Sequence, residues 1–248
     1  QTCALPIFSM SQPSVRVRSS DVLAQSRAVR WIPAAAFVLG ATLVGGCGER
    51  PASAATLQCR NLPILFHSYL QNHYSMRSET EELRSRTANE FIKALDPSKT
   101  LLLQDDVEKL RPKLERVFLT MKEGNCKALD EAQQVIQGRA QDDERSVKAL
   151  VNKDFKLDEN VEIMFDPDRR GYSKTDAERK DLLRKLVHLQ YSNYLLADVK
   201  PEEARKQLIH RYELMTKRLK ERQQRGEMPV LFAESFATAR SEEHTSEL

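Results

Sequence analysis

The sequence predicts an all-α fold, an irregular multi-helix domain with long helical hairpins. Its 248 residues include only 8 glycines, while 40% are hydrophobic and 30% are charged. Sandwiches and Rossmann folds need more glycine and more β-branched runs. Several long segments also carry apolar residues at the i, i+3, i+4 spacing of one helix face. The net charge of +3 does not demand a nucleic-acid partner, and none is expected.

The two ends of the chain, residues 1–7 and 240–248, resemble translated sequencing adapter. One back-translation of the first end is the reverse complement of part of a back-translation of the second. We therefore exclude both from fold reasoning, as one excludes fusion scars. Two ordinary polar tails are the alternative. On the adapter interpretation, we expect the reading frame to be cut at both edges and to continue beyond Ala239.

Residues 8–46 are predicted to be a signal peptide, with Met10 as the start. The apolar run at residues 31–44 is shorter than the ~18–20 residues that span a bilayer, which favours a cleaved signal over a transmembrane helix. A basic segment precedes this run, and it contains Arg16, Arg18, Arg27 and Arg30.

The apolar run ends in Leu-Val-Gly-Gly-Cys at residues 43–47, which resembles a bacterial lipobox. This resemblance implies a lipid on Cys47, cleavage before it, and a lipidated tether over residues 47–59. The membrane is then a partner through that lipid, on the periplasmic side of the bacterial cell envelope. The alternative is an ordinary signal peptide that is cleaved after residues 52–55 and leaves a soluble periplasmic protein.

Two further cysteines, Cys59 and Cys126, belong to the body of the chain. In an oxidising periplasm they form one possible disulfide, and the alternative is two separate buried thiols. No metal site is expected, because neither cysteine has a second one close by. His67, His73 and His188 are scattered along the chain and are interpreted as core or surface imidazoles.

Residues 60–239 are predicted to form the helical domain. An apolar stripe marks a helix over residues 60–74. Ser78 and Glu81 fit a capping box that opens the next helix, because the hydroxyl and the carboxylate each accept a free backbone N–H.

The stretch at residues 91–107 links two of these helices. Asp96-Pro97 stops the first, since proline disfavours the α region for the residue before it. The run Leu101–Leu103 has no polar side, so both of its faces should be buried. Asp105 or Asp106 can cap the following helix. That helix ends at Gly124-Asn125 and is kinked or restarted at Pro112.

The second half continues with a helix at residues 126–150 and an alternating segment at 155–165, which is a short strand or an extended segment. A loop at 166–171 leads to a helical hairpin, residues 175–196 and 201–225. The many basic residues of its second helix are interpreted as a solvated face, with a patch for an acidic partner or nucleic acid as the alternative. A last apolar helix starts at Met228, and four of its residues are expected to pack against domains outside this chain: Val230, Leu231, Phe232 and Phe236.

In order and spacing, residues 62–239 resemble the N-terminal domain of the bacterial tail-specific, or C-terminal processing, proteases. His73-Tyr74-Ser75 and Arg211-Tyr212-Glu213 add to the likeness, as does the helix at residues 232–239. The most specific part is a motif with a structural role, formed by Leu95, Asp96, Pro97, Leu101, Leu102, Leu103, Asp106 and Val107.

The resemblance implies a serine endopeptidase as the parent, with a PDZ domain that captures protein tails and a Ser/Lys pair that cleaves them. Neither part is expected here, so the resemblance assigns no catalytic residue to this chain, and no cofactor is expected. Its helical domain would act as a scaffold or docking face. The implied partners are the PDZ and protease domains of the parent, and exported substrates or an envelope adaptor.

Two other functions compete with this interpretation. One is a free-standing helical envelope lipoprotein that binds or scaffolds other proteins. The other is a cell-wall lytic enzyme with Glu81 or Glu82 as general acid. The sequence disfavours the enzyme, because no second carboxylate or aromatic sugar platform accompanies these residues.

We expect the chain produced in a Gram-negative host to incorporate radiolabelled palmitate, and Cys47→Ala to abolish the label because the acceptor thiol is lost. Gel fluorography of the immunoprecipitated chain measures this. Cys59→Ser is the matched control and should keep the label. Equal labelling of the Cys47→Ala chain would contradict the lipobox interpretation.

Overall fold

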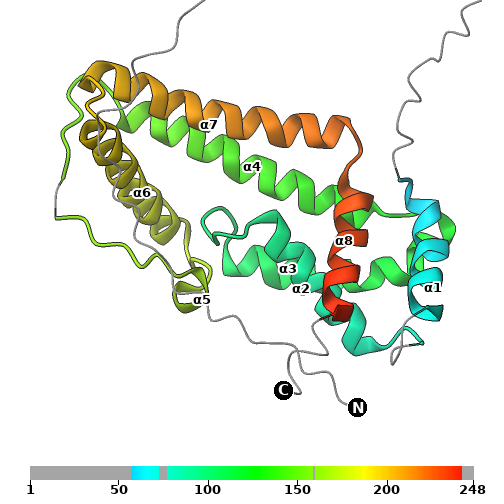
Figure 1. Cartoon of the computed structure of the whole chain (residues 1–248). Helices are drawn as coiled ribbons and strands as arrows, with labels where there is room; N and C mark the ends of the chain where they lie inside the picture. The colour runs from blue at the N-terminus through cyan, green and yellow to red at the C-terminus, as the bar shows by residue number, and fades with distance from the viewer. Residues whose placement is uncertain (1–56, 73–76, 159, 242–248) are drawn as a thin grey trace, which may run out of the picture. The chain divides into compact units, whose positions relative to one another are not determined.

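The structure is a computed structural model that describes residues 57–72, 77–158 and 160–241. Across these residues the chain forms eight α-helices and two 3-10 helices, and no strands pair into a sheet (Figure 1). The all-α prediction is confirmed. In the described part of the chain no helix is long and apolar enough to span a membrane. The elements in order are η1 (Cys59–Asn61), α1 (Leu62–Gln71), α2 (Glu81–Leu95), α3 (Gln104–Thr120), η2 (Met121–Glu123), α4 (Lys127–Leu150), α5 (Pro167–Arg170), α6 (Asp176–Leu196), α7 (Pro201–Gln224) and α8 (Met228–Ser241).

The start of α2 differs from the sequence prediction. The Thr80 hydroxyl caps the helix by accepting the Leu83 N–H at 3.1 Å, so the predicted Ser78 capping box is wrong. Thr80 has extended backbone angles and lies directly before two glutamates, Glu81 and Glu82, which favour the positive end of the helix dipole. The later start leaves the predicted apolar face of the helix unchanged.

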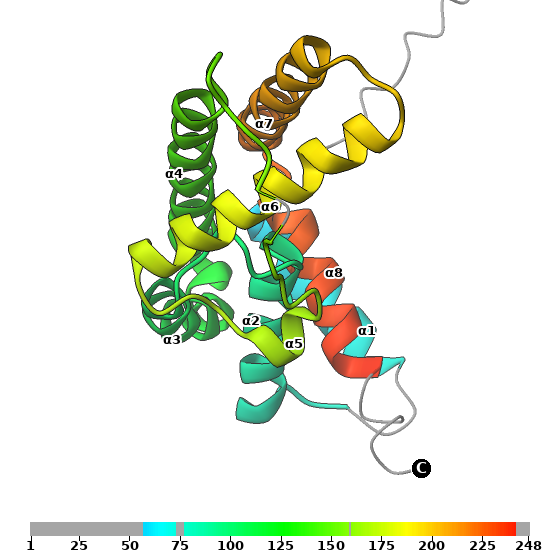
Figure 2. The same cartoon turned by 90° about the vertical axis from the view of Figure 1, so that its left-hand side faces the viewer.

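Helix α8 lies at the centre of the larger hydrophobic core, against α1, α2 and α4 (Figures 1 and 2). Phe232 and Phe236 are fully buried, and the Phe236 ring stacks on Phe66 with centroids 4.0 Å apart. Phe91 and Phe118 meet Phe232 at 5.6 and 5.5 Å. The expectation that the two phenylalanines of α8 need outside domains to cover them is therefore wrong. The aromatic side chains of α1, α2 and α3 cover them instead.

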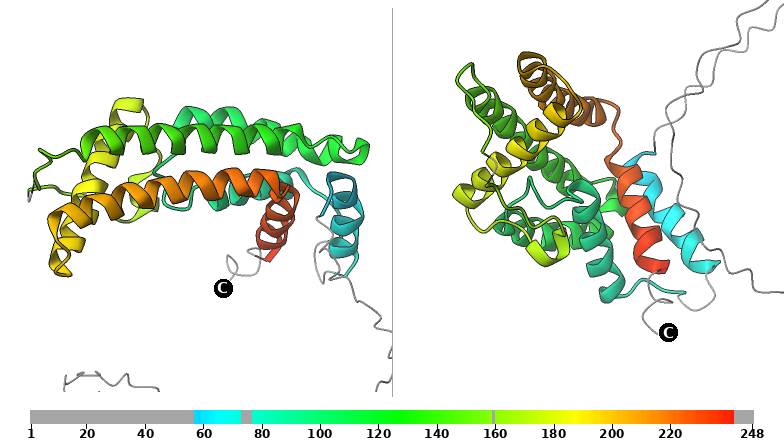
Figure 3. Two further views of the ribbon diagram at one scale, coloured as in Figure 1. Left: turned by 90° about the horizontal axis from the view of Figure 1, so that it is seen from above. Right: turned by 60° about the vertical axis from the view of Figure 1, so that its left-hand side comes forward.

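A second, smaller core joins the far half of α4 to α6 and α7. Helices α4 and α7 run antiparallel and side by side (Figure 3). Gln133 donates from Nε2 to the Leu219 carbonyl at 2.7 Å, and Lys148 pairs with Glu213 at 2.8 Å. The predicted hairpin of α6 and α7 is present, but α7 also packs along α4. That second contact spans distant parts of the sequence, and periodicity carries no information about it.

Three smaller predictions concern residues 155–165, residues 166–171 and Pro112. The alternating segment at residues 155–165 forms neither a helix nor a strand over its described residues, and residue 160 lies in a turn. The predicted loop at 166–171 contains the short helix α5, where Asp166 caps the N–H groups of Asp168 and Arg169. Helix α3 runs through Pro112 without interruption.

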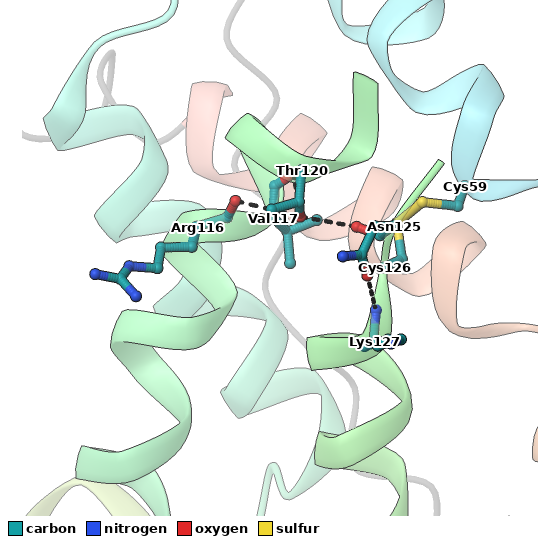
Figure 4. The surroundings of a disulfide bond; sticks show 7 residues. All are labelled: Cys59, Arg116, Val117, Thr120, Asn125, Cys126 and Lys127. Atoms are coloured by element: carbon teal, nitrogen blue, oxygen red, sulfur yellow. Dashed lines mark hydrogen bonds between the residues drawn. A yellow bond between two sulfur atoms is a disulfide. The ribbon is translucent and has the colours of Figure 1, made fainter. Parts of the chain in front are cut away.

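A disulfide joins Cys59 in η1 to Cys126 at the start of α4, with the two Cα atoms 5.9 Å apart (Figure 4). The turn before Cys126 depends on Gly124, which has a φ of +74°, and on Thr120, whose hydroxyl donates to the Asn125 carbonyl at 2.8 Å. The Asn125 side chain accepts the N–H of Lys127 at 3.2 Å. The structure thus contains the disulfide, which the sequence left as one of two alternatives.

We expect reduction of this disulfide to destabilise the chain by about 4 kcal/mol, because closing a loop with a sequence separation of 67 restricts the unfolded ensemble. Urea unfolding with and without dithiothreitol measures the loss. Cys59→Ser/Cys126→Ser is the control and should show no response to dithiothreitol. Equal midpoints for the oxidised and reduced wild-type chain would contradict the prediction.

Candidate functional site

The Leu-Asp-Pro motif lies in a loop between α2 and α3, residues 96–103, which we name the motif loop. The Asp96 side chain is 2% exposed and accepts three backbone N–H groups of its own loop. Thr100 donates to Oδ1 at 3.1 Å, while Leu101 and Leu102 both donate to Oδ2 at 2.9 Å. One carboxylate thus fixes the backbone that follows the helix. Because charged acceptors make the stronger hydrogen bonds, few other side chains would serve here.

The first residues of the motif loop form a tight turn. The Lys99 N–H donates to the Asp96 carbonyl at 3.1 Å, and Lys99 has a φ of +50°, a left-handed conformation that is uncommon for residues other than glycine. The Lys99 ammonium lies 2.9 Å from Asp168 and 5.6 Å from the centre of the Tyr172 ring. These contacts from α5 and the residues after it stabilise the strained turn.

The charges around this turn shift two pKa values. The hydrogen bond from Lys99 lowers the pKa of Asp168. Burial raises the pKa of Tyr172 to about 12, and the negative charge of Asp96 adds to the increase. Arg170 closes the outer side by donating to the carbonyl groups of Ser98 and Met164.

The apolar run that follows is more exposed than predicted at its end. Leu101 and Leu102 are buried, but Leu103 is only half-buried. The Gln104 N–H donates to the Ser173 carbonyl at 2.9 Å, which pairs this point of the chain with the residues before α6. The Gln104 N–H therefore has its partner in a distant segment, whereas the N–H groups of Leu101 and Leu102 bond to Asp96 within the motif loop.

Helix α3 begins at Gln104, with Leu103 as its N-cap residue, and of the two predicted capping side chains Asp106 takes this role whereas Asp105 does not. Asp106 lies inside the first turn and accepts the N–H of Leu103 at 3.0 Å. Asp105 lies on the surface and pairs with Lys109. The helix starts earlier because Leu103 keeps an extended backbone and its carbonyl accepts the first helical N–H, that of Val107.

Behind the motif loop, five charged side chains from α3, α4 and α6 form a continuous series, which we name the charge ladder. Asp106 receives two hydrogen bonds from Arg139, at 2.9 and 3.0 Å. Asp176 lies 3.7 Å from Arg139 and 3.1 Å from Arg179, and Arg179 in turn pairs with Asp143. The Arg179 side chain is fully buried. Such pairs are costly to break, so the ladder fixes how the three helices meet.

The last member of the charge ladder, Asp143, is a carboxyl group with an unusual pKa. Burial raises the pKa of Asp143 to about 6, and the neighbouring Arg179 opposes this only in part. Tyr212 of α7 lies nearby, and burial followed by the charge of Asp143 raises its pKa to about 12. In the middle of the ladder, Asp176 accepts hydrogen bonds from Lys180 and Arg179, which lower its pKa.

Between the motif loop, α6 and α7 lies an open cavity of about 800 Å³, which we name the α6–α7 cleft. The volume of this cavity is within the range found for sites that bind small molecules or peptide segments. Asp143 and Tyr212 form part of its lining. The remaining lining residues are Ser98, Thr100, Leu101, Leu183, Leu186, Gln190, Tyr194, Gln207, His210, Arg211, Leu214, Met215, Arg218 and Leu219.

The sequence profile of the tail specific protease N-terminal domain matches residues 66–246, which is most of the chain. The chain belongs to this family. It is also similar to the tail-specific protease of Haemophilus influenzae, with 25% identity over 150 residues. That alignment covers 60% of this chain and 22% of the relative, so the chain spans well under half of the relative's length.

The family motif occupies defined positions in the domain. Leu95 and Val107 are buried at the two ends of the linking stretch, and Pro97 is exposed in the turn. The structure therefore gives the motif an architectural position beside the α6–α7 cleft. Cys47, the predicted lipid acceptor, lies outside the described residues.

Residues considered for chemistry are spread apart in this domain. Glu81 and Glu82 are both exposed on the first turn of α2. Ser173 and Lys174, a serine and a lysine that are adjacent in the sequence, make contacts through their backbone: the Ser173 carbonyl accepts from Gln104, and the Lys174 N–H donates to Glu178. In the described ranges, no group of three histidine, cysteine or acidic side chains is placed to hold a metal ion.

His188 is a structural histidine. Its Nδ1 accepts the Asp158 N–H at 3.1 Å, and its ring lies 5.0 Å from that of Phe155. Burial, followed by the charge of Arg184, lowers the pKa of His188.

Sequence reasoning missed the charge ladder. Arg139, Asp143 and Arg179 lie on helices whose exposed faces are also rich in charge, so residue type alone does not separate a buried charge from a solvated one. The only signal is that Asp143 and Arg179 fall on the apolar side of their helices.

We expect Asp96→Asn to lower the free energy of unfolding of this domain by about 3 kcal/mol, because an amide has one acceptor oxygen for three buried N–H donors. Urea unfolding followed by circular dichroism measures the change. Asp105→Asn is the matched control and should stay within about 0.5 kcal/mol of the wild type. A loss of that small size for Asp96→Asn would contradict the assigned role.

The raised pKa of Asp143 gives a pH dependence of known sign. Between about pH 4, where an unfolded aspartate ionises, and pH 6, the folded chain binds this proton more readily than the unfolded one. The contribution of Asp143 to stability therefore falls as the pH rises through this window. We expect the stability of the wild type relative to Asp143→Asn to fall by on the order of 2 kcal/mol.

Urea unfolding of both chains at pH 4, 5, 6 and 7 measures this difference. The neighbouring Asp142→Asn is the control, because that carboxylate is more exposed and pairs with Arg145. Carboxylates with lowered pKa values, such as Asp181, act equally in all variants and cancel. A wild-type advantage that stays constant or grows from pH 4 to pH 6 would contradict the assignment.

Proposed function

We propose that this chain is the non-catalytic N-terminal scaffold and docking portion of a periplasmic C-terminal processing serine endopeptidase. The observation that supports this proposal most directly is the family match over residues 66–246. The name of the Haemophilus influenzae relative, a tail-specific protease, supports the same activity for the parent protein. On this proposal, the PDZ domain and the Ser/Lys dyad belong to a part of the parent protein that follows this domain.

The architecture suits a scaffold, because several separate interactions hold together elements that are far apart in the sequence. Asp96 fixes the motif loop, the charge ladder joins three helices, and the disulfide links η1 to the start of α4. The hydroxyl groups of Ser146, Ser192 and Ser235 donate to carbonyl groups of their own helices. Serines bonded in this way are poor candidates for nucleophiles, which need a neighbouring base.

The proposed location follows from the N-terminal residues. A lipid on Cys47 would tether the protein to a membrane of the bacterial envelope, on the periplasmic side. There, the exposed faces of the helical domain would meet the PDZ and protease domains of the parent. Exported protein substrates or an envelope adaptor are the further partners of this proposal.

A second candidate is a free-standing helical envelope lipoprotein that binds or scaffolds other proteins. One observation favours it: Phe232, Phe236 and Ala239 of α8 are fully buried within this domain. The larger core is thus complete without further domains. The family match favours the protease portion over this second candidate.

We expect a long sequencing read of the source DNA, taken through the codon for Ala239, to continue into a Leu-Asp-Pro-His motif, a PDZ domain and a Ser/Lys site. The complete protein should then cleave an exported protein near its C-terminus, whereas the 248-residue chain should not. Gel electrophoresis of the substrate measures cleavage.

Two controls make this test specific. Replacing the newly read dyad serine by alanine should abolish cleavage by the complete protein. The same exported protein with its C-terminal tail deleted should remain uncleaved. A stop codon directly after Ala239 would leave the lipoprotein candidate, and cleavage by the 248-residue chain alone would overturn its non-catalytic role.

A further inference from the structure

The α6–α7 cleft has the geometry of a binding groove. Its α7 wall presents Gln207, Arg211, Leu214 and Arg218, at the spacing i, i+4, i+7 and i+11 that places residues on one helix face. Helix α6 supplies the opposite wall, and the motif loop closes part of the rim through Ser98 and Thr100. The cavity is about 800 Å³ and open to solvent, so a chain segment can enter it without rearrangement of the helices.

The charged side chains that line the cleft are mainly basic. Arg211 and Arg218 are exposed, and neither has a carboxylate within ion-pair distance among the residues that the structure describes. The only acidic lining residue is Asp143, which is buried and already pairs with Arg179. His210 is also in the lining and faces Glu213 at 3.6 Å. Two uncompensated guanidinium groups favour a ligand that carries carboxylates.

The rest of the lining combines apolar and amide-like groups. Leu183, Leu186 and Leu214 offer contact for apolar side chains, and the flexible Met215 adapts to different shapes. Gln190 and Gln207 each carry both a donor and an acceptor, which is the pattern of a peptide backbone. Gln207 Nε2 already donates to Glu203 at 3.2 Å, but Gln190 Oε1 is buried and has no hydrogen-bond partner among the described residues. A fatty acyl chain would leave this oxygen without a partner, whereas a peptide N–H can donate to it, and this favours a peptide over a lipid.

We propose that the α6–α7 cleft binds an extended peptide segment with apolar side chains and carboxylate groups, and that Arg211 and Arg218 recognise the carboxylates. Leucine side chains of the two helices hold the apolar residues, and Gln190 and Gln207 bond the peptide backbone. This site is separate from the predicted Ser/Lys and PDZ parts of the parent. The inference does not rest on the proposed protease function, because the cleft is complete within this chain.

Fluorescence anisotropy with the 248-residue chain tests this proposal. The probe is a fluorescein-labelled ten-residue peptide of alternating leucine and glutamate with a free C-terminus. The matched probe has glutamine in place of glutamate and an amidated end. We expect the acidic peptide to bind at least tenfold more tightly. Equal affinities, or no binding of the acidic peptide at micromolar concentrations, would overturn the proposal.

Paired variants locate the binding surface. Arg211→Gln/Arg218→Gln should weaken binding of the acidic peptide at least tenfold. Arg205→Gln/Lys220→Gln removes the same charge from α7 outside the cleft and should leave binding within about twofold of the wild type. An equal loss in both would show attraction by net charge alone. Matching helicity and urea midpoints establish that the variants are folded.

Two further measurements separate a peptide from a lipid ligand. Leu214→Glu places a carboxylate in the cleft at helix spacings that allow it to pair with both arginines, and it should weaken binding of the acidic peptide. Gln207→Leu should weaken the peptide because it removes a backbone partner. Dodecanoate serves as the competitor. If dodecanoate displaced the peptide completely and Gln207→Leu left peptide affinity unchanged, the cleft would be a lipid site and the peptide proposal would fail.

Discussion

The conformation of this domain depends most on the hydrogen bonds that the Asp96 carboxylate accepts from the loop after it. A helix end normally leaves backbone groups without partners, and a buried loop would leave more. Asp96 satisfies three N–H groups at once and turns the chain so that Leu101 and Leu102 enter the core. Helix α3 then begins where the Gln104 N–H meets Ser173. Without this carboxylate, the link between the two helices would have no defined path.

The surrounding charges extend the same constraint to the second core. Asp106 belongs to the motif, and its partner Arg139 leads through Asp176 and Arg179 to Asp143. This ladder reaches the lining of the α6–α7 cleft, because Asp143 is both its last member and a lining residue. The residues that resemble the family motif are thereby joined to the cleft by direct contacts. Their structural role and the proposed peptide site belong to one arrangement of helices.

Helix α8 and the disulfide stabilise the larger core. Phe232 and Phe236 fill the space among the aromatic side chains of α1, α2 and α3. Cys59 and Cys126 tie the first helical turn to the start of α4. This closed core makes the helical domain a self-contained unit. In the proposed parent protein, such a unit supports other domains through its surface and does not contribute an apolar helix to their cores.

The sequence by itself determined the longer helices, because apolar periodicity, Pro97, Gly124 and Pro201 mark where they run and end, but it did not predict the short helix α5. It also determined the family, since the motif at Leu95–Val107 is local in sequence. Only the tertiary structure decided which charges are buried, which cysteines meet, and how α8 is covered. Each of those depends on residues far apart in the chain: Asp143 on Arg179, Cys59 on Cys126, and Phe236 on Phe66. Periodicity shows that a helix has an apolar face, but the partner of that face is set by packing among all the helices together.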